Sequence, residues 1–145
     1  MTRIDFHFNV NHRVHYACRV IRKARAAGKR AVVYTRNADR LAQMDSVLWT
    51  FSALDFVPHV YVDSPLAAAT PVLLASDADC APASDVLLTL DDDAPPHFEA
   101  FFARYERVVE VVSSDDEDRQ RARVRFKNYK ERGFEPGAFE AKNGD

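Results

Sequence analysis

Apolar positions recur with two different periods along the chain, and the two periods alternate. Residues Ile4–Val10 alternate apolar and polar side chains, which predicts a strand. Residues His12–Ala27 carry apolar side chains at helical spacing, and Gly28 is placed to end that helix. The apolar positions of this predicted helix are Val14, Ala17, Cys18, Ile21 and Ala24.

The same alternation continues to the end of the chain. Further strands are predicted at Arg30–Thr35, His59–Ser64, Pro71–Ser76, Ser84–Leu90 and Arg107–Ser113. Further helices are predicted from Asn37 to about Trp49, over Pro95–Tyr105 with both prolines in the first turn, and from a cap at Ser113 or Ser114 to Gly133.

Strands that alternate with helices predict an α/β fold with a largely parallel sheet. Because parallel crossovers are right-handed, helices should cover both faces, which makes a three-layer sandwich. We expect one domain over residues 1–145, with residues 136–145 as a candidate disordered tail.

The composition is that of a globular domain, with 47% hydrophobic and 11% aromatic residues. The N-terminus lacks a signal-peptide pattern, and no apolar run approaches the roughly 20 residues of a membrane span. Cys18 and Cys80 stand alone, without the spacing of metal ligands. We therefore expect a reduced, cytoplasmic protein without membrane contact, and we place Cys18 in its core.

The motifs of common enzymes are absent. The first strand–helix junction, FNVNHRVHY, has no glycine loop that could cradle phosphate, so we expect a nucleotide-binding-like fold that binds no such cofactor. No nucleophile–base signature occurs, which favours a binding module with no catalytic residues. An enzyme with a carboxylate site at Asp91–Asp93 is a minor alternative.

Two clusters of potential metal ligands have simpler interpretations. His12 and His15 lie three residues apart on one helix face, with His7 nearby, but no third ligand is evident. Asp91–Asp93 could hold Mg²⁺, yet the run also suits a turn before a helix. We predict solvent-facing or hydrogen-bonded histidines, a turn at the aspartates, and no metal.

Charge is concentrated near the C-terminus. Residues 119–132 contain seven Lys or Arg and one Glu, a net charge of +6 in a chain of net charge −2, which leaves −8 for the rest. On a helical wheel, an apolar arc lies beside a basic arc, and a second basic stripe lies on the far side. The apolar arc is Ala122, Phe126 and Tyr129, the basic arc is Arg119, Arg123, Lys127 and Lys130, and the second stripe is Arg121, Arg125 and Arg132.

This helix is either a plain amphipathic helix or one wall of an anion-binding groove. An aromatic edge beside cations suits an acidic peptide that ends in an aromatic residue, and it also suits single-stranded nucleic acid. The acidic remainder of the chain should repel an extended nucleic acid, so charge favours the peptide.

A second candidate surface is Leu48–His59, which gathers Trp49, Phe51, Phe56, Val57 and Pro58 in a short stretch. Core packing accounts for part of this cluster, but a helix–loop–strand junction cannot bury all of these side chains. Aromatic residues that remain exposed are typical of protein interfaces.

Several short motifs follow one another along the chain: the FHF strand, GKR before VVY, LW followed by FVPH, PVLL, and the final RxRFKxYKxxGF. With these motifs in this order, the chain resembles the chi subunit of the bacterial DNA polymerase III holoenzyme. The resemblance spans essentially the whole chain. It implies a non-catalytic accessory subunit of the clamp-loader assembly that acts in DNA replication. The implied partners are the psi subunit in a 1:1 heterodimer, the clamp loader through psi, and the acidic tail of single-stranded-DNA-binding protein, which ends in Pro-Phe. DNA contact is expected only indirectly.

The resemblance also implies which residues bind. Trp49, Phe56, Val57 and Pro58 match the psi-facing motif. The tail-binding motif corresponds to Arg119, Arg123, Phe126 and Lys127, with Val112 as a pocket wall and Lys130 beside them. Phe126 departs from the tyrosine often found there, which keeps the ring but loses a hydroxyl. The alternative remains a small single-stranded nucleic-acid-binding module that uses this basic helix.

Overall fold

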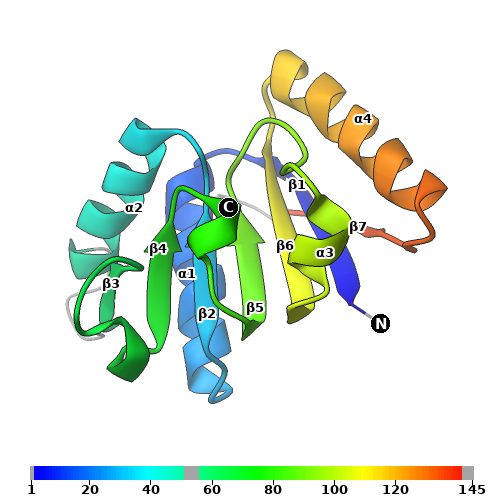
Figure 1. Cartoon of the computed structure of the whole chain (residues 1–145). Coiled ribbons are helices and arrows are strands. Elements are labelled where there is room, and N and C mark those ends of the chain that lie inside the picture. The colour runs from blue at the N-terminus through cyan, green and yellow to red at the C-terminus, as the bar shows by residue number, and fades with distance from the viewer. Residues whose placement is uncertain (1, 51–55, 142–145) are drawn as a thin grey trace.

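Within residues 2–50 and 56–141, which the computed structural model describes, seven strands form a single parallel sheet (Figure 1). The strand order is β3-β4-β2-β5-β6-β1-β7. The strands are β1 (Arg3–Val10), β2 (Ala31–Tyr34), β3 (His59–Tyr61), β4 (Val72–Ala75), β5 (Ser84–Thr89), β6 (Tyr105–Ser113) and β7 (Gly137–Glu140). The predicted α/β class and parallel sheet are confirmed.

Helices cover both faces of the sheet. The α-helices are α1 (Arg13–Ala26), α2 (Ala38–Thr50), α3 (Phe98–Phe102) and α4 (Asp116–Glu131), with short 3-10 turns at Ala67–Ala69 and Ala78–Cys80. Connections that run from β1 toward β3 place α1 and α2 on one face, and those that run back toward β7 place α3 and α4 on the other (Figure 1). Right-handed crossovers require this reversal of face.

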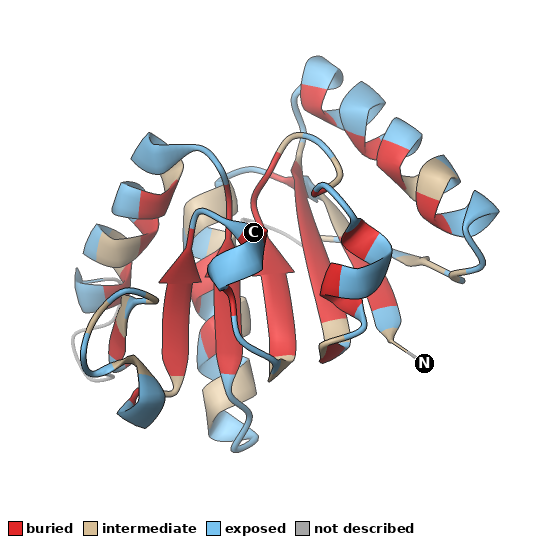
Figure 2. Cartoon of the chain, viewed as in Figure 1, coloured by how far each residue is buried: buried red, intermediate tan, exposed pale blue. Residues whose placement is uncertain are grey.

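The core is divided by the sheet into two apolar layers. Ile4, Phe6 and Tyr129 belong to the layer under α3 and α4, whereas Cys18 and Val33 belong to the layer under α1 and α2. Figure 2 shows the strands largely buried and the helices buried along the side that faces the sheet. Cys18 is fully buried, as predicted.

Strand β1 changes face near its end. The register with β6 shifts between His7 and Val10, and Asn9 has a left-handed φ of 62°. One extra residue at a bulge moves the next side chain to the other face of a sheet. Phe6 therefore packs under α4, while Val10 packs under α1.

The predicted start of the third helix was wrong. Helix α3 begins only at Phe98, because His97 takes a left-handed conformation with φ of 53° and separates the helix from Pro95 and Pro96. Residues 137–140, assigned to a candidate disordered tail, form β7, which pairs in parallel with β1 and places Ala138 opposite Phe6. Residues 142–145 lie outside the described part.

Candidate functional site

The local sequence sets both ends of α4. The Asp115 carboxylate accepts a hydrogen bond from the Asp118 backbone N–H at 3.1 Å and caps the helix. The predicted cap at Ser113 or Ser114 is therefore wrong. Three acidic residues follow in the first turn, where the helix dipole favours negative charge. At the other end, Gly133 adopts a φ of 95°, which glycine tolerates without strain, and stops the helix as predicted.

Arg125 points into the core instead of joining the solvent-facing stripe predicted with Arg121 and Arg132. Its side chain is 3% exposed, and its Nε lies 3.3 Å from Oε1 of Glu110, which is 1% exposed. The Tyr129 hydroxyl donates a hydrogen bond of 2.5 Å to the same carboxylate. Arg125 also donates to the backbone carbonyl of Asp92. A buried polar group is accommodated only when it is paired in this way.

This buried pair fixes the position of α4 on β6. Burial raises the pKa of Glu110, because desolvation of the carboxylate outweighs the stabilising Arg125 guanidinium and Tyr129 hydroxyl. The Arg125 guanidinium lies 6.0 Å from the centroid of the Phe6 ring, and Phe6 in turn packs 5.3 Å from Phe126. The ion pair thus supports an aromatic cluster at the surface of the sheet.

That cluster forms one side of a pocket of about 210 Å³ between α4 and the edge of the sheet. Its lining residues come from four elements. They are Phe6 and Phe8 of β1, Val112 of β6, Arg119, Ala122, Arg123 and Phe126 of α4, and Ala138 of β7. The pocket therefore joins an apolar interior to a rim that carries two guanidinium groups.

The structure brings four of the six predicted tail-binding residues together. Arg119, Arg123, Phe126 and Val112 all line this pocket. Val112 contributes as a buried wall, since it is only 1% exposed. Lys127 and Lys130 do not line the pocket, although both are exposed on α4.

The two rim arginines keep most of their charge available. Arg119 lies 3.8 Å from Asp116 Oδ1, and that carboxylate is 98% exposed, so water screens the pair. Arg123 has no ion-pair or hydrogen-bond partner within the described part of the chain. By contrast, Arg121 pairs with Glu117 at 3.1 Å, and Arg132 pairs with Glu99 at 2.6 Å. The second basic stripe is therefore largely neutralised by the protein's own carboxylates.

Sequence reasoning did not assign four pocket residues to the site, although it placed Ala122 on the apolar arc of the helix; the four are Phe6, Phe8, Ala122 and Ala138. The alternation in Ile4–Val10 already placed Phe6 and Phe8 on one face of a strand, which was a usable signal. Ala138 carried no signal, because β7 is a short strand with mostly exposed side chains.

The second predicted surface is partly exposed and partly core. Trp49 is 49% exposed and Phe56 is 65% exposed, and their ring centroids lie 5.1 Å apart. Pro58 is exposed beside them. Val57 is 3% exposed and belongs to the core layer under α1 and α2, so its side chain does not contribute to the surface. Phe51 lies outside the described residues.

A buried histidine holds this aromatic pair in place. The Trp49 ring lies 4.5 Å from the ring of His59, which is 3% exposed. His59 Nδ1 lies 2.7 Å from the carbonyl oxygen of Val57, and its Nε2 lies 3.0 Å from Oδ1 of Asp45 on α2. His59 therefore supports the Trp49 ring from the core side, while the Trp49 and Phe56 side chains remain partly exposed.

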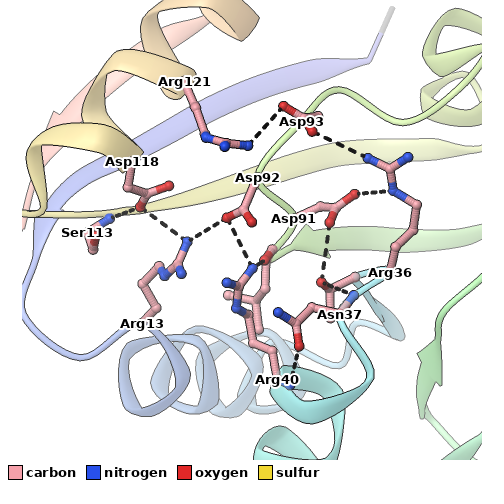
Figure 3. A network of polar contacts seen from close by, with 12 residues as sticks. Arg13, Arg36, Asn37, Arg40, Asp91, Asp92, Asp93, Ser113, Asp118 and Arg121 are labelled. Carbon is pink, nitrogen blue, oxygen red and sulfur yellow. Dashed lines mark hydrogen bonds and ion pairs between the residues drawn. The ribbon is translucent and has the colours of Figure 1, made fainter.

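Asp91–Asp93 lies in the connection after β5, which bends at Asp92 and Asp93, and a network of arginines surrounds it (Figure 3). Asp91 Oδ2 lies 2.8 Å from Arg36 Nε, and Asp92 Oδ1 lies 3.3 Å from Arg40 Nη1 and 3.6 Å from Arg13 Nη1. In doubly wound sheets, ligands bind at this carboxyl edge of the strands. Here the protein's own ion pairs occupy that edge.

No group of three His, Cys, Asp or Glu that could hold a metal ion occurs among the described residues. His12 and His15 lie near each other, with ring centroids 6.1 Å apart, and both are exposed. None of the described helices has the length and apolarity needed to cross a lipid bilayer.

The structure is an α/β domain with a parallel sheet between two layers of helices, and its first strand–helix junction carries no glycine loop. The family model for the DNA polymerase III chi subunit, HolC, matches residues 1–137. The chain belongs to this family, which makes it an accessory subunit of a replicative DNA polymerase and confirms the resemblance found in the sequence.

Two relatives carry the same description. The DNA polymerase III subunit chi of Pseudomonas aeruginosa strain PAO1 is 30% identical over 138 residues, which cover 92% of this chain and 93% of that protein. The DNA polymerase III subunit chi of Escherichia coli strain K12 is 27% identical over 118 residues, which cover 81% of this chain and 78% of that protein.

Proposed function

We propose that this subunit bridges two partners, the psi subunit and the acidic C-terminal tail of single-stranded-DNA-binding protein. The observation that carries the proposal is the pocket that combines Phe126 and Val112 with the guanidinium groups of Arg119 and Arg123. A peptide that ends in phenylalanine offers an apolar ring and a carboxylate at adjacent positions. The pocket likewise combines an apolar lining with guanidinium groups.

The terminal phenyl ring enters the pocket bounded by Val112 and Phe126, and the α-carboxylate meets Arg123 at the rim. Burying a phenylalanine side chain contributes roughly 1.5–3 kcal/mol. A hydrogen bond to a charged group contributes about 1.5–3 kcal/mol. After the cost of ordering the peptide, these terms correspond to roughly micromolar binding. Such affinity permits the exchange that a moving replicase requires.

Lys127 and Lys130 have a weaker, supporting role. Both lie on α4 outside the pocket and are exposed to solvent. Acidic residues upstream in the tail can run along them, but exposed charge pairs contribute little and are screened by salt. Salt should therefore weaken binding moderately without abolishing it.

The psi subunit binds the exposed aromatic patch of Trp49, Phe56 and Pro58. Exposed aromatic side chains held by a rigid base are typical of interface hot spots. Val57 supports this patch from the core. The patch lies next to β3, and the tail pocket lies on β1, five strands away in the sheet. At a strand spacing of about 4.8 Å, β3 and β1 lie about 24 Å apart along the sheet, which leaves room for both partners at once.

The tail assignment is tested by fluorescence anisotropy with an acidic peptide ending in Asp-Ile-Pro-Phe, as the free acid and as the C-terminal amide. Arg123→Ala should weaken binding of the free acid about tenfold to a hundredfold, the worth of a charged hydrogen bond. Arg121→Ala, on the same helix but outside the pocket, should change it little. Equal affinity for the acid and the amide would contradict the proposal.

The psi assignment is tested by co-purification with the psi subunit. Trp49→Ala or Phe56→Ala should weaken the complex by about 2 kcal/mol or more, as expected at a hot spot. Leu66→Ala removes another exposed apolar side chain, 63% exposed, and serves as the matched control. If all three variants retain psi equally, the aromatic patch is not the interface.

A further inference from the structure

A second basic region lies on α1, on the opposite face of the sheet from the tail pocket. No Asp or Glu occurs between Asp5 and Asp39, whereas eight Lys or Arg do. The net charge of −8 outside residues 119–132 is a sum that includes this strongly basic segment. The eight basic residues are Arg13, Arg19, Arg22, Lys23, Arg25, Lys29, Arg30 and Arg36.

This basic segment borders a groove of about 460 Å³ between α1 and strands β5, β6 and β1. Arg19 and Lys23 stand one helical turn apart on α1, about 6 Å along its axis, and both are exposed. Lys29 and Arg107 also line the groove, but Lys29 lies 3.7 Å from Glu106 and Arg107 lies 3.1 Å from Asp5, so these two cations add little net charge. Val20 and Val86 give it an apolar floor.

An aromatic ring and an unusual histidine also line this groove. His7 Nδ1 is hydrogen-bonded to the Tyr16 hydroxyl, and the His7 Nε2 atom is buried without a hydrogen-bond partner among the described residues. The Arg19 guanidinium lies 5.9 Å from the centroid of the Tyr16 ring. An aromatic face beside cations, with a buried polar atom left unpaired, is the chemistry of a binding site.

We propose that the α1 groove, bounded by Tyr16, Arg19, Lys23 and Arg107, binds single-stranded nucleic acid. Cations along α1 meet the phosphates, and a base stacks in the groove against Tyr16. In a duplex the base faces are stacked on one another, so they cannot stack against Tyr16 or contact the apolar floor of the α1 groove.

The position of the acidic side chains favours a nucleic-acid strand over an acidic peptide. Asp85 and Glu106 lie at one end of the groove, at the amino ends of β5 and β6. Both are already engaged, because Glu106 lies 3.7 Å from Lys29 and Asp85 accepts a hydrogen bond of 2.9 Å from the Arg30 backbone. The cations of α1 continue beyond them, and the groove offers an aromatic ring where a base can stack.

This surface goes beyond the proposed bridging function, in which DNA is reached only through a protein partner. The subunit would hold the tail of single-stranded-DNA-binding protein on one face of the sheet and a stretch of bare strand on the other. The two activities use different elements, α4 and α1. A substitution on one of these helices can therefore abolish one activity and leave the other intact.

The test is anisotropy of a labelled oligothymidylate of about 16 nucleotides with the full chain. With about three phosphate contacts, affinity should fall about twentyfold between about 50 mM and about 200 mM salt. At the lower salt, Lys23→Glu should weaken binding about tenfold. Lys130→Glu makes the same charge change on α4 and should alter binding less than about twofold. Lys23→Glu should leave the affinity for the acidic tail peptide unchanged.

An oligomer of the same charge with abasic sites should bind at least about fivefold more weakly, because base stacking is lost. Three results would each overturn the proposal. They are no binding of oligothymidylate at low salt, equal binding of the abasic oligomer, and a loss in Lys130→Glu as large as that in Lys23→Glu. The last result would place nucleic acid on α4. Displacement of the oligomer by the acidic tail peptide would equally assign the strand to the α4 pocket.

Discussion

Replacing Arg125 by methionine tests the buried ion pair that fixes α4 to the sheet. Arg125 and Glu110 are 3% and 1% exposed, with 3.3 Å between the Arg125 Nε and the Glu110 Oε1. Methionine approximates the length of the arginine stem but leaves the Glu110 carboxylate without its cation. The Tyr129 hydroxyl then remains as the one side-chain hydrogen-bond donor to that carboxylate among the described residues.

The expected loss of folding stability follows from the burial of both groups. Removing one member of a buried ion pair costs about 3–5 kcal/mol, because the remaining charge is buried without compensation. Domains of this kind unfold with a free energy of about 5–15 kcal/mol, so the loss is a large fraction of the total. At about 2–4 °C per kcal/mol, the Tm should fall by about 10 °C. Replacing both partners, as in Arg125→Met with Glu110→Leu, should recover most of this stability, because no charge is then left buried.

The pH dependence gives an independent check. The pKa of Glu110 is raised in the folded protein, so its contribution favours folding most below the unfolded pKa and is lost as pH rises through the folded pKa. Without the Arg125 cation, that pKa rises further. Arg125→Met should therefore be closest to the parent protein near pH 5 and most destabilised near pH 8.

The assay is thermal and urea unfolding followed by circular dichroism at both pH values. Unchanged stability of Arg125→Met at pH 8 would show that the ion pair does not hold α4. A double variant less stable than Arg125→Met alone would refute the argument that an uncompensated charge causes the loss.

Three further predictions concern the surfaces and the thiols. Ala138→Leu should fill the tail pocket and weaken the acidic peptide about tenfold in anisotropy, with stability within about 0.5 kcal/mol, because Ala138 is exposed; undiminished binding would remove β7 from the pocket wall. Cys18 is buried and its pKa is raised to about 12, so a thiol reagent at pH 8 should label only the exposed Cys80 until the chain is denatured; rapid labelling of both would contradict the burial. His59→Ala should cost about 1–3 kcal/mol in urea unfolding and weaken psi binding, because it removes the support under Trp49; normal psi affinity in the folded variant would separate the histidine from the interface.

Most of the fold was predictable because it follows from local patterns. The six predicted strands and four predicted helices all form, since period-two and helical apolar spacing select the faces that the sheet must bury. The seventh strand was not predictable from its side chains. β7 is joined to the sheet through backbone hydrogen bonds with β1 at an exposed edge, and Ala138 and Phe139 show no apolar alternation.

The candidate site was predictable in part for the same reason. Arg123 and Phe126 lie three residues apart on one helix, so helical geometry alone brings them to one rim. The helical wheel placed Arg125 on a basic stripe away from the apolar arc, because a wheel takes no account of residues on other elements. Its burial depends on Glu110, which lies on another strand and comes within reach only when α4 packs on β6.

The chain's own pattern was enough to establish an α/β domain without a phosphate loop, a basic C-terminal helix with an aromatic edge, and its likeness to the chi family. These properties depend on residues close together along the chain. The tail pocket, the exposed aromatic patch beside buried Val57, the arginines around Asp91–Asp93 and the groove beside α1 were set by packing. Each joins side chains from several elements, and contacts between residues distant in sequence exist only after the sheet and helices have come together.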